Sequence, residues 1–273
     1  MSDHAIEVQQ GERFGFGANW MRFLSVLNDE RIEEAKSSLK RMLNVESLEG
    51  KTFLDVGSGS GLFSLAARML GAKVYSFDYD PQSVACTAEL KRRYFPDDDW
   101  VVESGSVLDR DYLSRLGQFD VVYSWGVLHH TGHMWEALGN VAPLVKPEGQ
   151  LFIAIYNDQG SASVMWLAIK KVYNMLPSWL RLLVLIPSFI RLWLPTIIRD
   201  LVRGRPFRTW KTGPGVRGMS AWRDVVDWVG GYPFEVAKPE EIFAMYSAKG
   251  FRLEKLVTCA GGLGCNEFVF RSN

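Results

Sequence analysis

Cysteine and excess charge are both scarce in this chain of 273 residues. Its cysteines are Cys86, Cys259 and Cys265, too few for a disulfide framework and without the paired spacing of a zinc site. They suit a reducing compartment. The formal net charge is zero, so no overall field draws the chain to nucleic acid. These absences exclude a disulfide-rich secreted fold and argue against a nucleic-acid partner.

The chain also lacks the apolar segments that export and membrane insertion require. "MSDHAIEVQQGERFG" has no apolar stretch behind a basic start, so we expect no secretory signal and a cytoplasmic location. The longest apolar run, residues 181–204, is interrupted by Pro187, Arg191 and Pro195. An arginine at a bilayer centre costs roughly 2.5–3.5 kcal/mol. We therefore expect this run not to cross a membrane.

Short apolar runs alternate with helical patterns from about residue 51, which is typical of a parallel sheet with crossover helices. Strands are predicted at 52–56, 73–78, 100–105, 119–125 and 149–157. Two further runs, 251–260 and 265–272, predict an antiparallel pair that closes the sheet. The domain hypothesis assigns 1–50 to an N-terminal helical cap, 51–157 and 237–273 to the core, and 158–236 to a helical insertion.

A glycine-rich loop follows the first predicted strand, in "FLDVGSGSG". Its alternating glycines are Gly57, Gly59 and Gly61. Glycine there permits a tight turn and a close approach of the backbone to a ligand. A carboxylate at Asp55 would repel a pyrophosphate and favour a positively charged ligand such as a sulfonium. Asp78, at the end of the next strand, has the spacing expected of an acid that binds ribose hydroxyls.

The stretches "LDVGSGSG", "FDYD", "FDVVYSWGVLHH" and "LVKPEGQLFI" resemble, in this order, the motifs of class I S-adenosylmethionine-dependent methyltransferases. The resemblance covers roughly residues 50–157 and 249–271. It implies an α/β, Rossmann-like, seven-stranded mixed sheet with an antiparallel last strand and helices on both faces. The implied cofactor is S-adenosyl-L-methionine. A dinucleotide-binding fold is the alternative reading of the loop.

By position, the resemblance also implies a role for individual residues. Gly57, Ser58 and Gly59 would line the methionine part of the cofactor. Asp78 would hold the ribose and Tyr79 would cover one face of the adenine. The family usually has an acid where this chain has Ser106, so Ser106, Asp109 or backbone would bind the adenine amine. The full set expected at the cofactor is Asp55, Gly57, Ser58, Gly59, Gly61, Asp78, Tyr79, Ser106, Val107 and Trp125.

The segment after the fourth predicted strand, "SWGVLHHTGH", bears on the acceptor. It lacks the Asn/Asp-Pro-Pro-aromatic motif of enzymes that methylate amino groups of adenine or glutamine. It is similar to small-molecule methyltransferases of the quinone-biosynthesis type. His129 or His130 would serve as general base for a hydroxyl acceptor. Alternatively His130 caps or packs the next helix; no carboxylate accompanies the histidines, so we expect no metal site.

Five residues are expected on the acceptor side: Phe16, Trp20, Asn157, Tyr232 and Asn266. "ERFGFGANW" predicts an N-terminal flap in which Phe16 and Trp20 close over the cofactor, with glycines as hinges. The alternative is that Trp20 only anchors a helix to the core. Tyr232 follows a Gly-Gly turn, and Asn266 begins the last predicted strand.

The insertion carries a strong local charge. Between residues 181 and 223 there are nine basic residues and one acid, Asp200. Apolar helices that are broken by prolines and followed by arginines are typical of elements that lie on an anionic bilayer. We expect peripheral membrane contact through 181–211, or a lid that admits an isoprenoid or acyl chain. A homodimer interface and a lid packed on its own core stay open.

The sequence therefore predicts a methyltransferase that acts on a small, lipophilic acceptor, with O-methylation favoured. One alternative is a small polar acceptor such as a sugar or a thiol, for which the arginines would bind phosphate or carboxylate. Another is a non-catalytic partner subunit that binds the cofactor.

Overall fold

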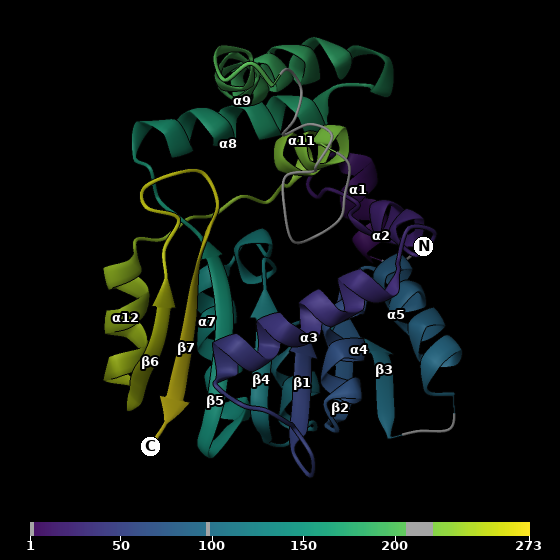
Figure 1. Ribbon diagram of the computed structural model, residues 1–273, viewed down its shortest axis with the longest axis vertical. Helices are drawn as coiled ribbons and strands as arrows, with labels where there is room; N and C mark the ends of the chain where they lie inside the picture. The colour runs from purple at the N-terminus through teal and green to yellow at the C-terminus, as the bar shows by residue number, and fades with distance from the viewer. Residues whose placement is uncertain (1–2, 97–98, 206–220) are drawn as a thin grey trace.

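A single seven-stranded sheet organises the chain (Figure 1). The computed structural model describes residues 3–96, 99–205 and 221–273. In spatial order the strands are β3 (Trp100–Ser104), β2 (Lys73–Asp78), β1 (Thr52–Val56), β4 (Phe119–Trp125), β5 (Val145–Tyr156), β7 (Cys265–Ser272) and β6 (Phe251–Val257). Strand β7 pairs antiparallel with both of its neighbours, and the other pairs are parallel. The predicted Rossmann-like fold is confirmed.

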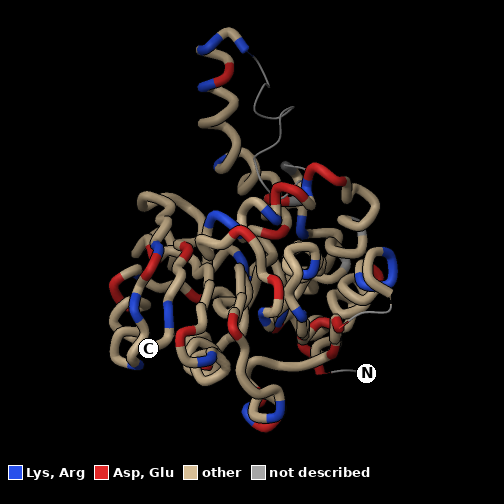
Figure 2. The backbone as a smooth tube through the Cα atoms, turned by 60° about the horizontal axis from the view of Figure 1, so that its bottom comes forward, with Lys and Arg blue, Asp and Glu red and all other residues tan. Residues whose placement is uncertain are grey.

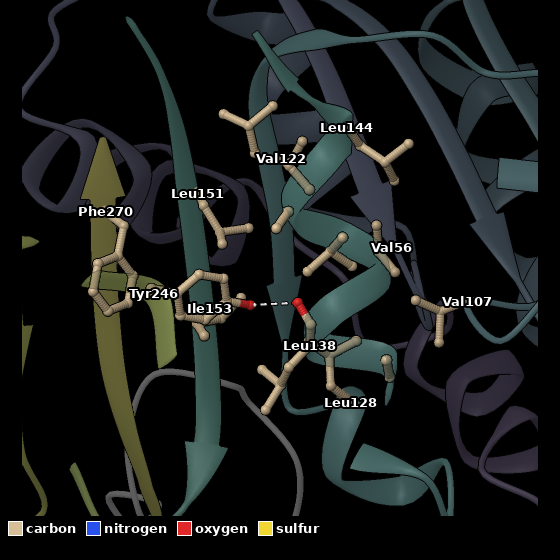
Figure 3. Close-up of a cluster of buried hydrophobic side chains, with 14 of the residues drawn as sticks. Val56, Val107, Val122, Leu128, Leu138, Leu144, Leu151, Ile153, Tyr246 and Phe270 are labelled. Atoms are coloured by element: carbon tan, nitrogen blue, oxygen red, sulfur yellow. Dashed lines mark hydrogen bonds between the residues drawn. The ribbon is translucent and has the colours of Figure 1, made fainter. Parts of the chain in front are cut away.

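Helices cover both faces of this sheet. One face carries α3 (Asp29–Leu43), α4 (Leu62–Met69) and α5 (Pro81–Tyr94). The other carries α6 (Arg110–Ser114), α7 (Met134–Val141) and α12 (Pro239–Ala248). Tyr246 of α12 is fully buried, and its hydroxyl donates to the carbonyl oxygen of Leu138 in α7 at 3.0 Å (Figure 3). This bond satisfies the one polar atom of a ring that otherwise packs among apolar side chains.

The helix starts follow from capping side chains. Asn28 accepts a hydrogen bond from the backbone N–H of Arg31 and caps α3. Asp80 caps α5 in the same way, and Pro81 occupies its first turn, where a missing N–H costs nothing. These caps fix where α3 begins after α2 and where α5 begins after β2.

Two groups of helices lie at that carboxyl edge (Figure 1). One is N-terminal, α1 (Asp3–Gln10) and α2 (Gly17–Phe23). The other belongs to the insertion, α8 (Ser161–Met175), α9 (Leu182–Val202) and α11 (Ala221–Gly230). Three short 3₁₀ turns complete the described helices: Leu128–His130, Ala142–Leu144 and Ser178–Leu180.

Helix α9 differs from the sequence prediction. The expected break at the prolines is wrong, because Pro187 and Pro195 both lie inside one continuous helix. Each proline is exposed, so the carbonyl group that loses its helical partner can bond water instead. As a result, residues Ser178–Val202 are long and apolar enough for a membrane span by length and composition, with a mean hydropathy of 1.6. Only 17% of that apolar window is buried in the protein.

Candidate active site

The glycine loop between β1 and α4 has a conformation that other residues rarely adopt. Gly57, Gly59 and Gly61 have φ angles of 81°, 54° and 78°. A Cβ atom on Gly57 would lie 2.3 Å from a methyl group of Val127, so this position also has no space for a side chain. The amides of Gly57 and Ser58 both donate to the carbonyl oxygen of Phe77. The loop is therefore fixed against the end of β2.

Asp78 holds the same loop from the end of β2. Its Oδ2 accepts from the Gly59 amide at 2.8 Å, and its Oδ1 accepts from the Asp80 amide at 2.9 Å. Burial raises the pKa of Asp78 to about 6, although these backbone donors act in the opposite direction. The structure thus brings the predicted ribose acid and the predicted glycines together.

Asp55 lies below the loop instead of facing outward. Since side chains alternate along a strand, Asp55 points to the same face as Phe53, toward α4. It is buried and accepts from the hydroxyl of Ser64, which also bonds to Ser76 at 2.8 Å. Burial raises the pKa of Asp55 to about 7. Asp55 therefore supports the loop from within the core.

The predicted N-terminal flap, residues 12–20, crosses the site from the loop to the insertion. The indole nitrogen of Trp20 lies 3.2 Å from the point where a Cβ on Gly59 would stand. The amide of Gly17 donates to Asp80 at 2.7 Å, and the amide of Phe14 donates to the carbonyl oxygen of Tyr232 at 2.8 Å. The predicted flap residue Trp20 is thus placed directly over the loop.

Tyr79 lies under helix α1. Its hydroxyl donates to Glu7 at 3.0 Å, and the guanidinium of Arg13 lies 5.0 Å from the centre of its ring. The ring of His4 meets the same ring edge-on at 5.6 Å. The face of Tyr79 expected at the cofactor is therefore bordered by side chains of the N-terminal segment.

The two candidate catalytic histidines occupy the 3₁₀ turn after β4, and both are buried. His129 accepts the Tyr156 amide at Nδ1, so its neutral ring carries the proton on Nε2. His130 has the opposite tautomer, because its Nδ1 lies 2.6 Å from the carbonyl oxygen of Pro233, which can only accept. Burial lowers the pKa of His130 to about 3, so its Nε2 stays unprotonated at neutral pH.

The chain returning from the insertion holds this turn in place. The Glu235 amide donates to the carbonyl oxygen of His129 at 3.0 Å, while the Glu235 carboxylate accepts the amide of Met134 at the start of α7. Glu235, and not His130, therefore caps that helix. Within residues 3–96, 99–205 and 221–273, no group of three or more His, Cys, Asp or Glu side chains is placed to hold a metal ion.

Rings from three parts of the chain surround the histidines. We call this group the aromatic cluster; it consists of Phe16, His129, His130, Tyr156, Trp228 and Phe234. Phe16 lies 5.0 Å from the His130 ring, and Tyr156 lies 3.9 Å from the His129 ring. Tyr156 also contacts Trp228 at 5.2 Å. The predicted acceptor residue Phe16 therefore reaches the predicted base.

Lys170 of α8 was not among the predicted site residues. Its ammonium group is buried, donates to the carbonyl oxygen of Trp228, and lies 4.6 Å from the centres of the Trp228 and Phe234 rings. Burial lowers its pKa to about 7, against a smaller opposing effect of Asp227. The signal was present in the sequence: Trp166, Lys170 and Tyr173 have the spacing of one buried helix face.

The remaining predicted cofactor residues have local bonding partners. The Ser106 hydroxyl accepts the Leu108 amide, and Asp109 caps α6 by accepting the Tyr112 amide at 2.9 Å. Asp109 is thereby committed to the helix, whereas Ser106 is half-buried near the end of β3. Val107 is packed in the core below.

Three further predicted residues meet at the edge formed by β4, β5 and β7. The indole nitrogen of Trp125 donates to Glu267 at 3.0 Å. Asn266 donates to the side-chain oxygen of Asn157 at 3.0 Å, so these two predicted acceptor residues bond to each other. Tyr232 contributes its backbone carbonyl oxygen, which accepts the hydrogen bond from the Phe14 amide of the flap.

Comparison with known proteins adds independent findings. Residues 27–193 match a family described as a methyltransferase domain. A tRNA U34 carboxymethyltransferase of Methylococcus capsulatus is 32% identical over 119 residues, covering 43% of this chain and 36% of that protein. A ubiquinone biosynthesis O-methyltransferase of Nitrosococcus oceani is 31% identical over 128 residues, covering 44% of this chain and 49% of that protein. The match spans less than half the length of each relative.

Solved structures share the fold. Magnesium protoporphyrin IX methyltransferase from Synechocystis, crystallised with bound SAH, has a TM-score of 0.52 at 13% identity, covering 89% of this chain and 83% of that one. A putative S-adenosylmethionine-dependent methyltransferase from Listeria monocytogenes gives the same TM-score of 0.52, covering 88% and 99%. With a domain match over more than half its length and this sheet order, the chain belongs to the class I S-adenosylmethionine-dependent methyltransferase family.

Proposed function

We propose that the chain transfers the methyl group of S-adenosylmethionine to an oxygen of a small, lipophilic acceptor lying against the aromatic cluster. The observation that carries this proposal is the cluster itself, which places rings from the flap, the histidine turn and the insertion beside one another. Ring faces of this kind favour a flat, apolar ligand. The similarity to a ubiquinone biosynthesis O-methyltransferase supports the same class of acceptor.

The described residues fit the cofactor. Val127 packs against Gly57 and supports the glycine loop, and Asp78 stands next to the loop at the strand end. The carboxylate of Asp78 would accept the ribose hydroxyls, and the loop would border the methionine part. When bound, the cofactor supplies an electrophilic methyl group on a positively charged sulfur.

The chemistry requires the acceptor oxygen to approach that methyl group in line. Transfer would form an O–CH₃ bond as the S–CH₃ bond breaks and would release the hydroxyl proton of the acceptor, which a residue of the chain must take up. Holding both partners in a dry site supplies most of the acceleration. A base with a pKa near the working pH takes the proton most effectively.

Two described residues are candidates for this base. His130 has an unprotonated Nε2, but a pKa of about 3 makes it too weak a base to take the proton and leaves it the role of accepting a hydrogen bond. Lys170, with a pKa of about 7, is closer to the ideal value and lies beside the same rings. We propose that His130 orients the acceptor hydroxyl by accepting its hydrogen bond, and that Lys170, in its neutral amine form, takes the hydroxyl proton.

The deciding experiment uses S-adenosylmethionine labelled in its methyl group, the purified chain and a cell extract separated into organic, aqueous and macromolecular fractions. Label in the organic fraction supports the proposal. Label in the aqueous fraction would replace it with a small polar acceptor such as a sugar or thiol. Ribonuclease-sensitive label in the macromolecular fraction would replace it with an RNA acceptor, the substrate class named by the carboxymethyltransferase relative.

If no fraction is labelled, cofactor binding is measured by calorimetry on the same preparation. Tight binding without turnover in any fraction would support the alternative of a non-catalytic partner subunit. A matched reaction with Asp78→Ala gives the background, because that variant lacks the carboxylate assigned to the ribose.

A further inference from the structure

Helix α9 presents a continuous apolar stripe to solvent. Its members recur every four residues and therefore form a row that winds slowly around the helix: Leu182, Ile186, Ile190, Leu194 and Ile198. Each of these side chains is 46–52% exposed. The last residue of α8, Met175, and Trp179 in the turn before α9 are more exposed still. Exposed apolar surface of this extent marks an interaction site.

Other residues of α9 attach the helix to the protein. Leu185, Ser188 and Trp193 are buried, and the apolar ones belong to a cluster with residues of α8 and α11. Figure 2 shows the C-terminal part of α9 standing out from the body of the protein. A helix held in this way can lie along a flat surface without losing its contacts to α8 and α11.

The charges along α9 and the three residues that follow it are almost all positive. Arg191, Arg199, Arg203 and Arg205 are exposed. The acid of this segment, Asp200, is buried. The nearest acids along the sequence on either side are Asp158 and Asp224. Apolar side chains flanked by arginines match a surface that offers both hydrocarbon and negative charge.

We infer that α9 and the preceding turn form a docking surface for an anionic lipid bilayer, with the helix lying in the interface instead of crossing it. Trp179 would sit at headgroup depth, where indole rings are favoured. A second copy of the chain fits less well, because a symmetric contact would bring Arg191 and Arg199 of both copies together with little negative charge to offset them. The inference does not depend on the proposed acceptor, since membrane binding is measured without turnover.

The test is co-sedimentation of the full chain with vesicles of phosphatidylcholine alone or mixed equally with phosphatidylglycerol. We expect binding to the mixed vesicles, little binding to the neutral ones, and release on raising the salt concentration. Replacing Arg191, Arg199 and Arg203 with Gln should lower the partition coefficient by roughly 100-fold, since each cation near such a surface contributes on the order of fivefold.

The apolar contribution has a matched control. Ile190→Asp with Leu194→Asp should abolish sedimentation, whereas Phe243→Asp on α12, where the side chain is 47% exposed, should leave it intact. Circular dichroism and cofactor binding show that each variant is folded. Equal binding to both vesicle types, or unchanged binding of the Ile190/Leu194 variant, would overturn the inference.

Two other outcomes would also overturn it. Membrane association that resists alkaline carbonate extraction would indicate a spanning helix, which the length and hydropathy of Ser178–Val202 allow. Absence of vesicle binding, together with concentration-dependent dimerisation that Leu194→Asp abolishes, would show that a second copy covers the stripe.

Discussion

The Nδ1 atom of His130 lies 2.6 Å from the carbonyl oxygen of Pro233, a residue 103 positions further along the chain. This bond fixes the tautomer of the ring and joins the turn after β4 to the segment that returns from the insertion. The orientation of a candidate catalytic group is thus determined by a region outside the sheet. Changes in the insertion can therefore alter the chemistry at the turn without touching the cofactor.

His130→Ala should lower kcat by about 100-fold, which is the lower end of the range for loss of a group that transfers a proton or orients the substrate. Because the pKa of His130 is about 3, kcat of the wild-type chain should show no acidic limb from this residue above about pH 5. His133→Ala, at an exposed position on the same turn, is the control and should retain kcat. An unchanged kcat in His130→Ala would assign His130 to packing alone.

The buried ammonium group of Lys170 should make the free energy of unfolding vary with pH in the alkaline range. Its folded-state pKa of about 7 lies below the ordinary 10.5, so between these values the unfolded chain binds more protons. The free energy of unfolding should therefore rise with pH across that window, and Lys170→Met should remove this slope. Urea unfolding at pH 7 and pH 10 measures it, with Lys171→Met at an exposed position as control. Equal slopes in Lys170→Met and the wild type would contradict the lowered pKa.

Asp78→Ala should weaken binding of S-adenosylmethionine on the order of 100-fold, because two hydrogen bonds to a charged group are lost at the ribose. The pKa of Asp78 is about 6 in the protein, so affinity of the wild-type chain should also fall as the pH drops below that value. Calorimetry at pH 5 and pH 8 tests both expectations. Asp109→Asn changes an acid that caps α6 and should bind normally. An affinity for S-adenosylmethionine that is the same at both pH values would show that binding does not require ionised Asp78.

Gly57 and Gly126 form a matched pair for testing the loop. Both have a positive φ, 81° and 74°, but a Cβ would collide with Val127 only at Gly57 and meets open space at Gly126. Gly126→Ala should cost about 1 kcal/mol of stability from backbone conformation alone. Gly57→Ala should cost about 2–4 kcal/mol, since overpacking adds to the same penalty. Equal losses in thermal or urea unfolding would show that the loop moves to relieve the contact.

Three strands were predictable because each is a short apolar run that ends at an acid or directly before a glycine. The runs at 52–56, 73–78 and 119–125 agree with β1, β2 and β4. Helix α9 was less predictable. Pro187 and Pro195 lack an N–H, so each leaves one carbonyl group of the preceding turn without a helical donor. The helix continues only if those carbonyl groups reach water. That depends on exposure in the folded chain, which the sequence alone does not report.

Some residues of the site were also predictable from the sequence, and others were not. Gly57, Gly59 and Asp78 follow from motif spacing, and the structure places them in contact through the Gly59 amide. Lys170 was missed, because a lysine in an apolar helix is ordinarily expected to reach solvent. Its burial depends on Trp228 and Phe234, which lie more than fifty residues away along the chain and are brought together only by the insertion.

The flap described above has a kinetic consequence. Trp20 covers the glycine loop and Phe16 covers the histidine turn, so a single segment borders the routes of both the cofactor and the acceptor. Exchange of S-adenosylhomocysteine and departure of the methylated product should then require the same displacement. We expect the release of products, and not methyl transfer, to limit turnover, so that kcat decreases as solvent viscosity is raised while the single-turnover rate does not.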